Sequence, residues 1–408
     1  MKRRVVVTGM GLVVGDARDK ESFARLCFAG DSIIKKCSVF DTQGLSTPFF
    51  GEAEGLGEEA ALAEREKPRN GRFFELLKLS AQGLLSDAGV TREYIETLGR
   101  NCRMFFGTLI FSADAYDRHC RARREGKEAF DDSLASMNEF SGYARELLGI
   151  RGATTVISSS CASGTTAIGM AMDYIRSGLC ECAVAGGVDC LAQHTAYGFH
   201  ALKSMSSGVT NPFDAKRDGI NIGECGALFF LESLEHAQAR GAAIAGEISG
   251  YALSNDAYHI TSPRPDGEGA YRTIKAALED AGITAGEVGY INAHGTGTSA
   301  NDSMEAKALE RVFGESDRPV PLSSTKALLG HCMGASGAIE LASVILALQN
   351  QKYIPMPRLK ESIVTGKGLR IASESFPLEA MYALKNSFAF SGNSSALVVR
   401  RYGGEARE

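Results

Sequence analysis

Two distant stretches of this sequence share one design. Thr154–Ile175 and Pro321–Ile345 each begin as a short strand, pass through a Ser-Ser step and enter a helix of small residues. A second pair, beginning at Gly223 and Gly392, also joins a small-residue turn to an apolar strand. We therefore predict an internal duplication, with one half spanning residues 1–240 and the other 241–408.

Strand and helix patterns alternate along the chain, which is typical of an α/β protein with buried sheets. The predicted strands are Arg4–Val7, Thr154–Ile157, Cys182–Val184, Ala227–Leu231, Val288–Asn292 and Ala396–Arg400. The predicted helices are Arg72–Asp87, Ser163–Ser177, Ala270–Ala281, Ser303–Phe313 and Ala335–Asn350.

Composition excludes several classes of protein. The chain has 408 residues, 44% of them hydrophobic, and a formal net charge of −5. This hydrophobic content and net charge exclude a strongly basic nucleic-acid binder and a disordered chain. No apolar run reaches the ~20 residues of a membrane-spanning helix, so we expect no insertion into a membrane. The basic N-terminus followed by valines is interrupted by Thr8, Gly9 and Gly11, which favours a first strand over a signal peptide.

Ten cysteines are scattered through the chain without a C-x-x-C pair. They are too sparse for a disulfide scaffold, and no second pair matches Cys180 and Cys182 to make a zinc site. We expect most of them to be small buried residues of a protein in the reducing cytoplasm.

Cys161 differs from the other cysteines in its setting. A β-branched strand ends in three serines, Cys161 follows, and a helix rich in Ala and Gly begins. A thiol at the N-terminus of a helix meets unpaired amides and the positive end of the dipole, which favour a thiolate. The sequence predicts a nucleophile here, although a structural cysteine fits a strand-to-helix turn equally well.

Two histidines also follow predicted strands. His294 precedes Gly-Thr-Gly-Thr298, and His331 ends a Ser-Ser-Thr-Lys326-Ala-Leu-Leu-Gly-His run. Either could be a hydrogen-bonded core residue. Together with Cys161 they lie beyond strand ends, where ligands collect in open α/β sheets. A cysteine with two histidines and no acidic partner suits thioester chemistry better than a hydrolase triad, because imidazoles can stabilise a developing enolate.

With these motifs the sequence resembles the β-ketoacyl-acyl carrier protein synthases of the thiolase superfamily, specifically the type II elongating enzymes. Matching segments follow the family order over nearly the whole chain: the Cys161 turn, His294-Gly-Thr-Gly-Thr, the Lys326–His331 run, Asn211-Pro-Phe-Asp214, Arg217-Asp-Gly219, Asn255–Pro263 and Asn386-Ser-Phe-x-Phe390.

The resemblance implies a thiolase-like, five-layered αβαβα fold built from two duplicated halves. It also implies an acyltransferase that performs decarboxylative Claisen condensation in fatty-acid, polyene or polyketide chain elongation. Cys161, in the N-terminal half, would accept the acyl chain. His294 and His331, in the C-terminal half, would assist malonyl decarboxylation. The amides of Cys161 and Phe390 would form the oxyanion hole.

Further roles are implied by the same resemblance. Lys326 would be part of the catalytic group, with Glu340, Asp302 and Glu305 in support, and Thr296 and Thr298 would contact phosphopantetheine. No cofactor would be required, since phosphopantetheine arrives on the carrier protein. A structural Na⁺ or K⁺ would lie near Asn292, Glu340, Asn386 and Ser387.

The expected partner is an acidic acyl carrier protein, acyl- or malonyl-loaded. Its docking needs a local basic patch despite the net charge of −5. Our candidates are Lys67, Arg69, Arg72 and Lys203. The resemblance further implies a homodimer, with a heterodimer of related subunits as the alternative.

Substrate-related positions depart from the family pattern. Leu109, Ile110 and Phe111 add bulk where glycines are usual, near the expected acyl pocket. The gate, formed by Phe388, Ala389, Phe390 and Ser391, carries Ala389 and Ser391 in place of glycines, which restricts its torsions. These departures leave a specialised polyene, polyketide or lipid pathway open beside primary fatty-acid synthesis.

Two other functions fit the residues less well. A non-catalytic subunit resembling chain-length factors would typically lack the nucleophile, whereas Cys161, both histidines and Lys326 are present. A coenzyme A thiolase would normally add a second catalytic cysteine near the C-terminus, and no cysteine follows Cys332.

Overall fold

The computed structural model describes residues 3–56, 71–111, 113–126, 137–316 and 318–403. Within these residues, one large sheet of eleven strands runs through the molecule. Its N-terminal part consists of β1 (Val5–Val13), β4 (Cys102–Gly107), β5 (Thr154–Ile157), β6 (Cys182–Asp189) and β7 (Cys225–Ser233). These strands lie in the order β5-β4-β6-β7-β1, so the third strand in sequence is at the edge.

The C-terminal part repeats this order. Its strands are β8 (Gly246–Asn255), β9 (Val288–Asn292), β10 (Val320–Ser323), β12 (Tyr382–Phe388) and β13 (Asn393–Arg400), with the short β11 (Leu369–Arg370) beside β10. Their order is β10-β9-β12-β13-β8, again third, second, fourth, fifth, first. Each pair of neighbouring strands in this part is parallel or antiparallel as in the corresponding pair of the N-terminal part. The two parts join where β1 pairs with β8, and the duplication expected from the sequence is therefore visible in the topology.

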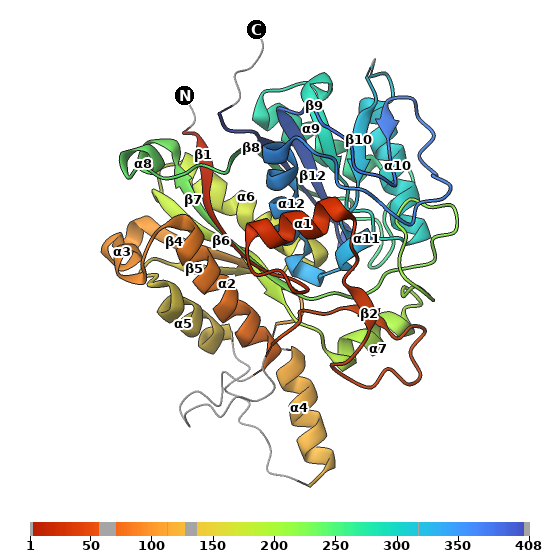
Figure 1. Ribbon diagram of the computed structural model, residues 1–408, viewed down its shortest axis with the longest axis horizontal. Helices are drawn as coiled ribbons and strands as arrows, with labels where there is room; N and C mark the ends of the chain where they lie inside the picture. Colours follow the sequence, from red (N-terminus) through yellow and green to blue (C-terminus); the bar gives the residue numbers. More distant parts are fainter. Residues whose placement is uncertain (1–2, 57–70, 112, 127–136, 317, 404–408) are drawn as a thin grey trace.

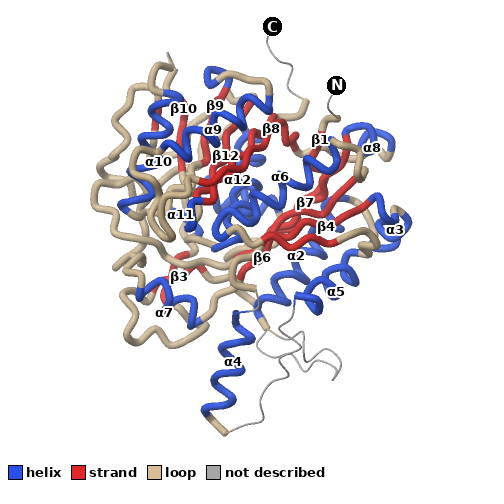
Figure 2. Tube along the Cα trace, turned by 180° about the vertical axis from the view of Figure 1, so that it is seen from behind, coloured by secondary structure: helices blue, strands red, loops and turns tan. Residues whose placement is uncertain are grey.

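Helices cover and separate the two parts of the sheet (Figures 1 and 2). The central pair, α6 (Ser163–Arg176) and α12 (Ser336–Asn350), contact each other and lie between the two parts. On the outer faces, α2 (Arg72–Ala88) and α5 (Met137–Leu148) cover the first part, and α9 (Glu268–Ala281) and α10 (Ser299–Phe313) cover the second. This arrangement confirms the predicted five-layered, thiolase-like α/β fold.

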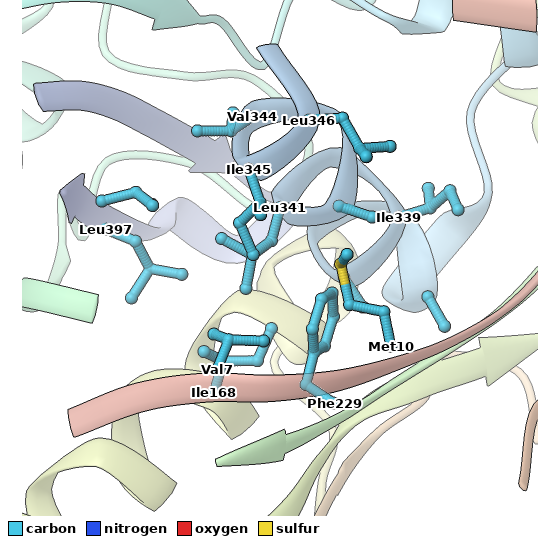
Figure 3. Packing of buried hydrophobic residues seen from close by; sticks show 14 of the residues in the cluster. Val7, Met10, Ile168, Phe229, Ile339, Leu341, Val344, Ile345, Leu346 and Leu397 are labelled. Atoms are coloured by element: carbon cyan, nitrogen blue, oxygen red, sulfur yellow. The ribbon is translucent and has the colours of Figure 1, made fainter. Parts of the chain in front are cut away.

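The largest apolar core surrounds the central helices. Ile339, Leu341 and Ile345 of α12 pack towards Val7 of β1 and Phe229 of β7 (Figure 3). Every residue of α12 from Ser336 to Leu348 is buried, so this helix has no solvent-facing side. A helix buried all round fixes its neighbours tightly, because protein interiors are close-packed. The polar Glu340 in its first turns is thus placed inside the molecule.

The remaining elements lie around these layers. They are α1 (Lys20–Ala29), β2 (Ile34–Lys36), β3 (Phe49–Gly51), α3 (Arg92–Thr97), α4 (Ala113–Arg124), α7 (Gln193–Ala201), α8 (Leu234–Ala239) and α11 (Lys326–Leu329). The α4 helix projects from the body of the molecule (Figure 1). No helix of the described residues is long and apolar enough to cross a membrane.

All the strands and helices expected from the sequence are present, most of them with shifted ends. The strands β4, β8 and β12, the short strands β2, β3 and β11, and the helices α1, α3, α4, α5, α7, α8 and α11 were not predicted. The β12 strand is central in its half and yet carries Lys385, Asn386 and Ser387, all of them buried. Buried polar residues interrupt the apolar pattern by which a central strand is usually detected. The boundary predicted at residue 240 falls between α8 and β8.

Candidate active site

Cys161 lies in a tight turn between β5 and α6. The preceding Ser160 has a φ of +54°, and a single 3-10 turn, Ser160–Ala162, leads into the helix. The hydroxyl of Ser163 donates to the carbonyl of Ser160 at 2.6 Å and accepts from the amide of Ser159 at 2.9 Å. These bonds hold the backbone in a conformation that few non-glycine residues adopt, and they present the thiol at the start of α6.

The thiol is buried, and burial raises the pKa of Cys161 to about 11. The charge of Lys326 and hydrogen bonds from the amides of Phe390 and Cys161 lower this pKa, but by less. The sequence had suggested a thiolate stabilised by the helix terminus. The structure corrects this expectation, because desolvation disfavours the charged form. Cys161 rests as a thiol whose sulfur lies near the two amides.

His294 lies just after β9, in a loop held by two carboxylates. Glu305 accepts from the amides of His294 and Gly295, both at 2.8 Å. Asp302 accepts from the amide of Thr296 at 2.9 Å and from that of Gly297 at 3.1 Å. Both acids are buried in α10, and burial raises the pKa of Glu305 to about 7. The cap of α10 is Thr298, whose side chain accepts from the amide of Asn301.

His331 follows α11 and is fixed from both sides. Its Nδ1 accepts from the amide of Met333 at 3.1 Å and lies 3.0 Å from the hydroxyl of Ser336. Its own amide donates to the carbonyl of Asn221 at 2.7 Å, a contact from the N-terminal half. The rings of His294 and His331 are 5.5 Å apart and nearly perpendicular. The two imidazoles therefore form one pair.

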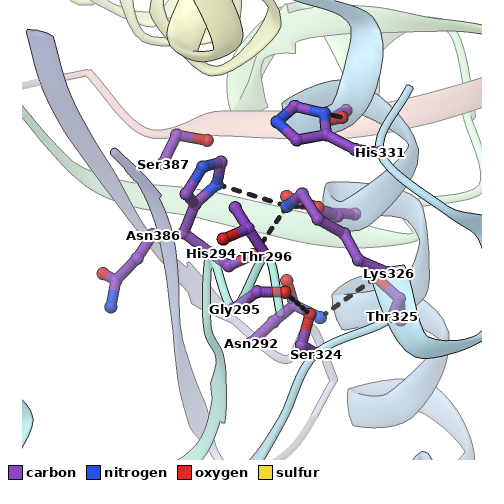
Figure 4. Close-up of polar contacts among 12 residues, drawn as sticks. Asn292, His294, Gly295, Thr296, Ser324, Thr325, Lys326, His331, Asn386 and Ser387 are labelled. Carbon is purple, nitrogen blue, oxygen red and sulfur yellow. Dashed lines mark hydrogen bonds and ion pairs between the residues drawn. The ribbon is translucent and has the colours of Figure 1, made fainter. Parts of the chain in front are cut away.

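Lys326 connects His294 to Glu340, and Figure 4 shows its contacts with His294. Its ammonium donates to the carbonyl of His294 at 2.7 Å, lies 3.2 Å from Nδ1 of the same ring and forms an ion pair with Glu340. An ammonium has only donors, so Nδ1 of His294 accepts and Nε2 carries the proton. The amide of Met333 imposes the same tautomer on His331.

Both imidazoles are neutral. Burial, followed by the positive charge of Lys326, holds the pKa of His294 well below its usual range. Burial, Lys326 and then Lys385 act in the same direction on the pKa of His331. Each ring can therefore present an Nε2–H donor to an oxygen that gains negative charge during a reaction.

A second lysine, Lys385 of β12, also lies beside Glu340. Its ammonium lies 3.0 Å from Oε2 of Glu340 and also hydrogen-bonds to Ser387. These are two of the four residues expected around a bound Na⁺ or K⁺. The other two, Asn292 and Asn386, keep buried amide oxygens that accept no hydrogen bond within the described residues, and Oε2 of Glu340 accepts none either. One positive charge, the Lys385 ammonium, therefore already lies beside two of the four residues expected around the cation.

One pocket opens onto the thiol and both imidazoles. Cys161, His294 and His331 line it together with Thr296 and Thr298, the two expected phosphopantetheine contacts. The other lining residues are Phe199, Ser204, Ile220, Thr261, Ser262, Pro263, Asn301 and 388–392. The rings of Phe199 and Phe390 stack at 6.0 Å. The pocket thus joins catalytic groups from both halves.

The expected acyl-pocket and gate residues divide into three groups. Phe388, Ala389, Phe390 and Ser391 line the pocket. Leu109 and Ile110 do not line it, but they pack into an apolar cluster that includes its lining residues Phe199 and Ile220. Phe111 does not line it either, and its ring packs 5.1 Å from that of Phe73 in the outer core. The Ser391 φ of +65° is the strained torsion expected where serine replaces glycine.

The residues expected to dock the carrier protein differ in their exposure and pairing. Lys67 and Arg69 lie outside the described residues. Arg72 is not free to dock, because its guanidinium forms an ion pair with the fully buried Glu224 and donates to the carbonyl of Ala53 at 3.0 Å. Lys203 is exposed, directly after α7. The side chains of Arg121, Arg123 and Arg124 are also exposed, on α4.

Sequence reasoning missed Lys385, Ser336, Asn221 and Phe199. Lys385 had one usable signal, since a lysine directly before Asn386-Ser-Phe interrupts a run of β-forming residues. The other three act through hydrogen bonds to a ring nitrogen or backbone and through ring stacking. Such contacts depend on the folded arrangement and leave no mark in the local pattern.

Two models of known protein families match most of this chain. The family model described as "Beta-ketoacyl synthase, N-terminal domain" matches residues 2–237. The model described as "Beta-ketoacyl synthase, C-terminal domain" matches residues 245–360. The first match contains Cys161, and the second contains His294, Lys326, His331 and Glu340.

Full-length relatives agree with the family models. A 3-oxoacyl-[acyl-carrier-protein] synthase 2 of Vibrio cholerae is 33% identical over 412 residues, which cover 98% of this chain and 99% of that protein. The protein of the same name from Staphylococcus aureus (strain COL) is 32% identical over 417 residues, covering 98% and 99%.

Solved structures of similar chains have the same fold. The ishigamide ketosynthase/chain length factor superposes with a TM-score of 0.89 at 31% identity, covering 99% of this chain and 100% of that one. A type II polyketide synthase acyl-carrier protein in complex with its ketosynthase, bound to the hexaketide, gives a TM-score of 0.85 at 30% identity, covering 98% and 100%.

Proposed function

Because the chain belongs to the β-ketoacyl synthase family, we propose that it condenses a malonyl unit with an acyl chain held on Cys161, using His294 and His331 for decarboxylation. The protein is a β-ketoacyl-acyl carrier protein synthase, an acyltransferase of fatty-acid or polyketide-type elongation. The single observation that supports these residue roles is the pocket that the thiol shares with two neutral imidazoles.

In the first half-reaction, the sulfur of Cys161 attacks the thioester carbonyl of the acyl-carrier protein. The thiol loses its proton as the C–S bond forms, and the departing phosphopantetheine sulfur takes up a proton. Amides near the sulfur, those of Cys161 and Phe390, donate to the oxygen that becomes negative. Because the resting thiol has a raised pKa, deprotonation accompanies attack and does not precede it.

In the second half-reaction, the malonyl thioester enters the emptied pocket, and its carbonyl oxygen accepts from Nε2–H of His294 and His331. Loss of CO₂ leaves an electron pair on the adjacent carbon and negative charge on that oxygen. Two preorganised donors stabilise this charge. The carbon then attacks the acyl carbonyl on Cys161, the C–S bond breaks, and the thiol is regenerated by a proton.

In this proposal Thr296 and Thr298 contact the phosphopantetheine arm of the carrier protein. Both line the pocket, and their hydroxyls are 2.9 Å apart. The Thr296 hydroxyl can therefore give up its hydrogen bond to Thr298 and form one to a polar group of phosphopantetheine, with little net change in free energy. The apolar cluster behind Phe199 and Ile220, which contains Leu109, Ile110 and Met333, would receive the acyl chain.

The proposal includes a dimer and an acidic carrier protein as partners. At one end of the sheet, β5 is an edge strand, whose free backbone groups can pair with another chain. A second copy is our first choice, and a related subunit is the alternative. One similar solved structure is described as a ketosynthase in complex with its chain length factor from Xenorhabdus doucetiae. Lys203 and three arginines of α4, Arg121, Arg123 and Arg124, are the exposed positive groups we propose for the carrier.

We place the enzyme in the cytoplasm, because all ten cysteines are free thiols and free thiols persist in a reducing compartment. A chain-length-factor-like subunit without catalysis is disfavoured by the complete set of Cys161, His294, His331 and Lys326 around one pocket. A coenzyme A thiolase would need a second cysteine at the pocket, and Cys161 is the only cysteine among the described lining residues.

The test separates the two half-reactions. Cys161→Ala should form no acyl adduct by intact-protein mass spectrometry with acyl-loaded carrier protein. His294→Ala and His331→Ala should form the adduct but lose malonyl decarboxylation. An acyl adduct on Cys161→Ala would overturn the nucleophile, and unchanged decarboxylation in both histidine variants would overturn their role. A panel of acyl chains of different length and unsaturation would then define the substrate.

A further inference from the structure

Lys385 is a fully buried ammonium that the proposed steps do not use. Its side chain is 0% exposed, and that of Glu340, which it contacts, is 2% exposed. Three oxygens surround its Nζ: Oε2 of Glu340 at 3.0 Å, the hydroxyl of Thr165 at 2.8 Å, and the hydroxyl of Ser387. An ammonium group has three N–H donors. Two of them have hydroxyl acceptors, and the charge is paired with the carboxylate of Glu340, whose Oε2 accepts no hydrogen bond.

These three partners come from the elements that carry the reacting groups. Thr165 is on α6, one turn beyond Cys161. Glu340 is on α12, and Ser387 is on β12, just before the Phe390 amide. The hydroxyls of Thr165 and Ser387 also lie 2.9 Å apart. Lys385 therefore links the nucleophile, the oxyanion amide and the histidine region at one point.

Glu340 is shared between two lysines. Lys326 binds Oε1 and Lys385 lies at Oε2, with both ammonium groups buried. A buried carboxylate needs its charge compensated, and Lys326 alone would compensate it. The second ammonium leaves this group of three with one net positive charge. A free Na⁺ or K⁺ beside a Lys326–Glu340 pair would leave the same charge.

An ammonium and an alkali cation compete for the same kind of surroundings. Both carry a single positive charge, and both are bound by carboxylate and hydroxyl oxygens. In this chain the oxygens of Glu340 and Ser387 already face Nζ of Lys385. A free cation at that point would be repelled by the ammonium, which already lies 3.0 Å from Oε2 of Glu340 and donates to the hydroxyl of Ser387.

We propose that Lys385 is a tethered cation of the active site, which takes the place of a free monovalent ion beside Glu340 and Ser387 and positions Glu340, and through it Lys326 and His294. The inference rests on the proposed function, because it concerns the same reaction. Lys385 does not line the pocket, so it is a positioning residue and has no contact with the substrate.

The consequence is an enzyme that needs no added salt cation. Losing the Lys385 charge should leave Glu340 to Lys326 alone and free Ser387 and Thr165 from their shared donor. Decarboxylation should then slow by about 10–100-fold, in kcat more than in KM, because positioning and not substrate contact is lost.

Two variants separate charge from volume. Lys385→Met keeps most of the side-chain volume and removes the charge. Lys385→Ala leaves a space in which a small cation could bind. Lys275→Met, on the exposed face of α9, is the control for removal of a lysine. Each is assayed for CO₂ release from malonyl-pantetheine and for its thermal midpoint, at constant ionic strength in choline, potassium or methylammonium chloride.

We expect wild type and Lys275→Met to give the same rate and midpoint in all three salts. Lys385→Met should be slow in all of them. Lys385→Ala should be slow in choline and should recover, in rate and in midpoint, with a saturable dependence on potassium or methylammonium.

Three results would overturn the inference. The first is a saturable potassium dependence of wild type, which would show a separate cation site at the amide oxygens of Asn292 and Asn386. The second is a wild-type rate in Lys385→Met. The third is failure of both cations to restore Lys385→Ala. Acyl-adduct formation on Cys161 is measured in parallel, and its loss in Cys161→Ala tests the proposed function independently of Lys385.

Discussion

The ammonium of Lys326 lies 3.2 Å from Nδ1 of His294 and 2.7 Å from the carbonyl of the same residue. These contacts select the imidazole tautomer with the proton on Nε2. Burial, with the added charge of Lys326, holds the pKa of the ring well below its usual range and keeps it neutral. His294 can then donate a hydrogen bond to the substrate. The chemistry of this histidine is therefore determined by a neighbour that never touches the substrate.

Removing that neighbour should disable decarboxylation more than acylation. In Lys326→Met, Nδ1 loses its donor and either ring nitrogen can carry the proton. We expect the rate of CO₂ release from malonyl-pantetheine to fall ~100–1,000-fold, as when one oxyanion donor is lost. The acyl adduct on Cys161 should still form. A decarboxylation rate within a few-fold of Lys275→Met, the surface control, would contradict this role.

The Cys161 thiol should react slowly at neutral pH. Because its pKa is raised to about 11, the thiolate fraction rises about tenfold per pH unit between pH 7 and 9. The alkylation rate with iodoacetamide should follow this slope without a plateau. The modified cysteine is identified by peptide mass spectrometry, with Cys161→Ala as the control. A plateau beginning below about pH 8 would instead indicate a resting thiolate.

Glu305 should make folding stability depend on pH. Its folded-state pKa is raised from 4.5 to about 7, so the folded protein binds more protons than the unfolded chain between these values. Its contribution to stability is therefore fully present below the unfolded pKa and is lost as the pH rises towards 7. Glu305→Gln removes this titration.

The measurement is urea unfolding of wild type and Glu305→Gln at a series of pH values. The free energy of unfolding of wild type, minus that of the variant, should decrease from about pH 5 to pH 7 and then stay constant. The variant should also be less stable by ~1–3 kcal/mol at neutral pH, since its amide cannot accept from both backbone donors. A difference that increases with pH would contradict the assignment.

The variant Ile220→Ala should accept longer acyl chains than wild type. Ile220 lines the pocket and packs in the same cluster as Leu109 and Ile110, so its truncation enlarges the space beyond Cys161. Ile222→Ala is the matched control, because Ile222 is buried in this cluster without lining the pocket. Both should lose ~2–5 kcal/mol of stability.

Competition between acyl-carrier proteins of different chain lengths checks this expectation. Only Ile220→Ala should shift the product distribution towards longer chains. An equal shift in Ile222→Ala would attribute the effect to general loosening of the core, and no shift in either variant would place the acyl chain elsewhere.

The sequence was sufficient for the two halves, the central helices and the residues that meet at the pocket, because small-residue turns after apolar strands leave a local pattern. It was insufficient where buried polarity replaces that pattern, as in β12 with Lys385. It also did not predict how individual ionisable side chains are paired or how burial shifts their pKa values. Arg72 resembled a surface cation and instead pairs with Glu224, and the Cys161 pKa is set by burial more than by its place at a helix terminus.

The most direct test of the account supplies acyl-loaded and malonyl-loaded carrier proteins together to wild type and to Cys161→Ala. Product mass and CO₂ release are followed in the same reaction. Wild type should give a β-ketoacyl product longer by a two-carbon unit, with one CO₂ for each product and a transient acyl adduct on Cys161. Cys161→Ala should give no such product. Condensation by Cys161→Ala at the wild-type rate would contradict the central claim that Cys161 carries the acyl chain.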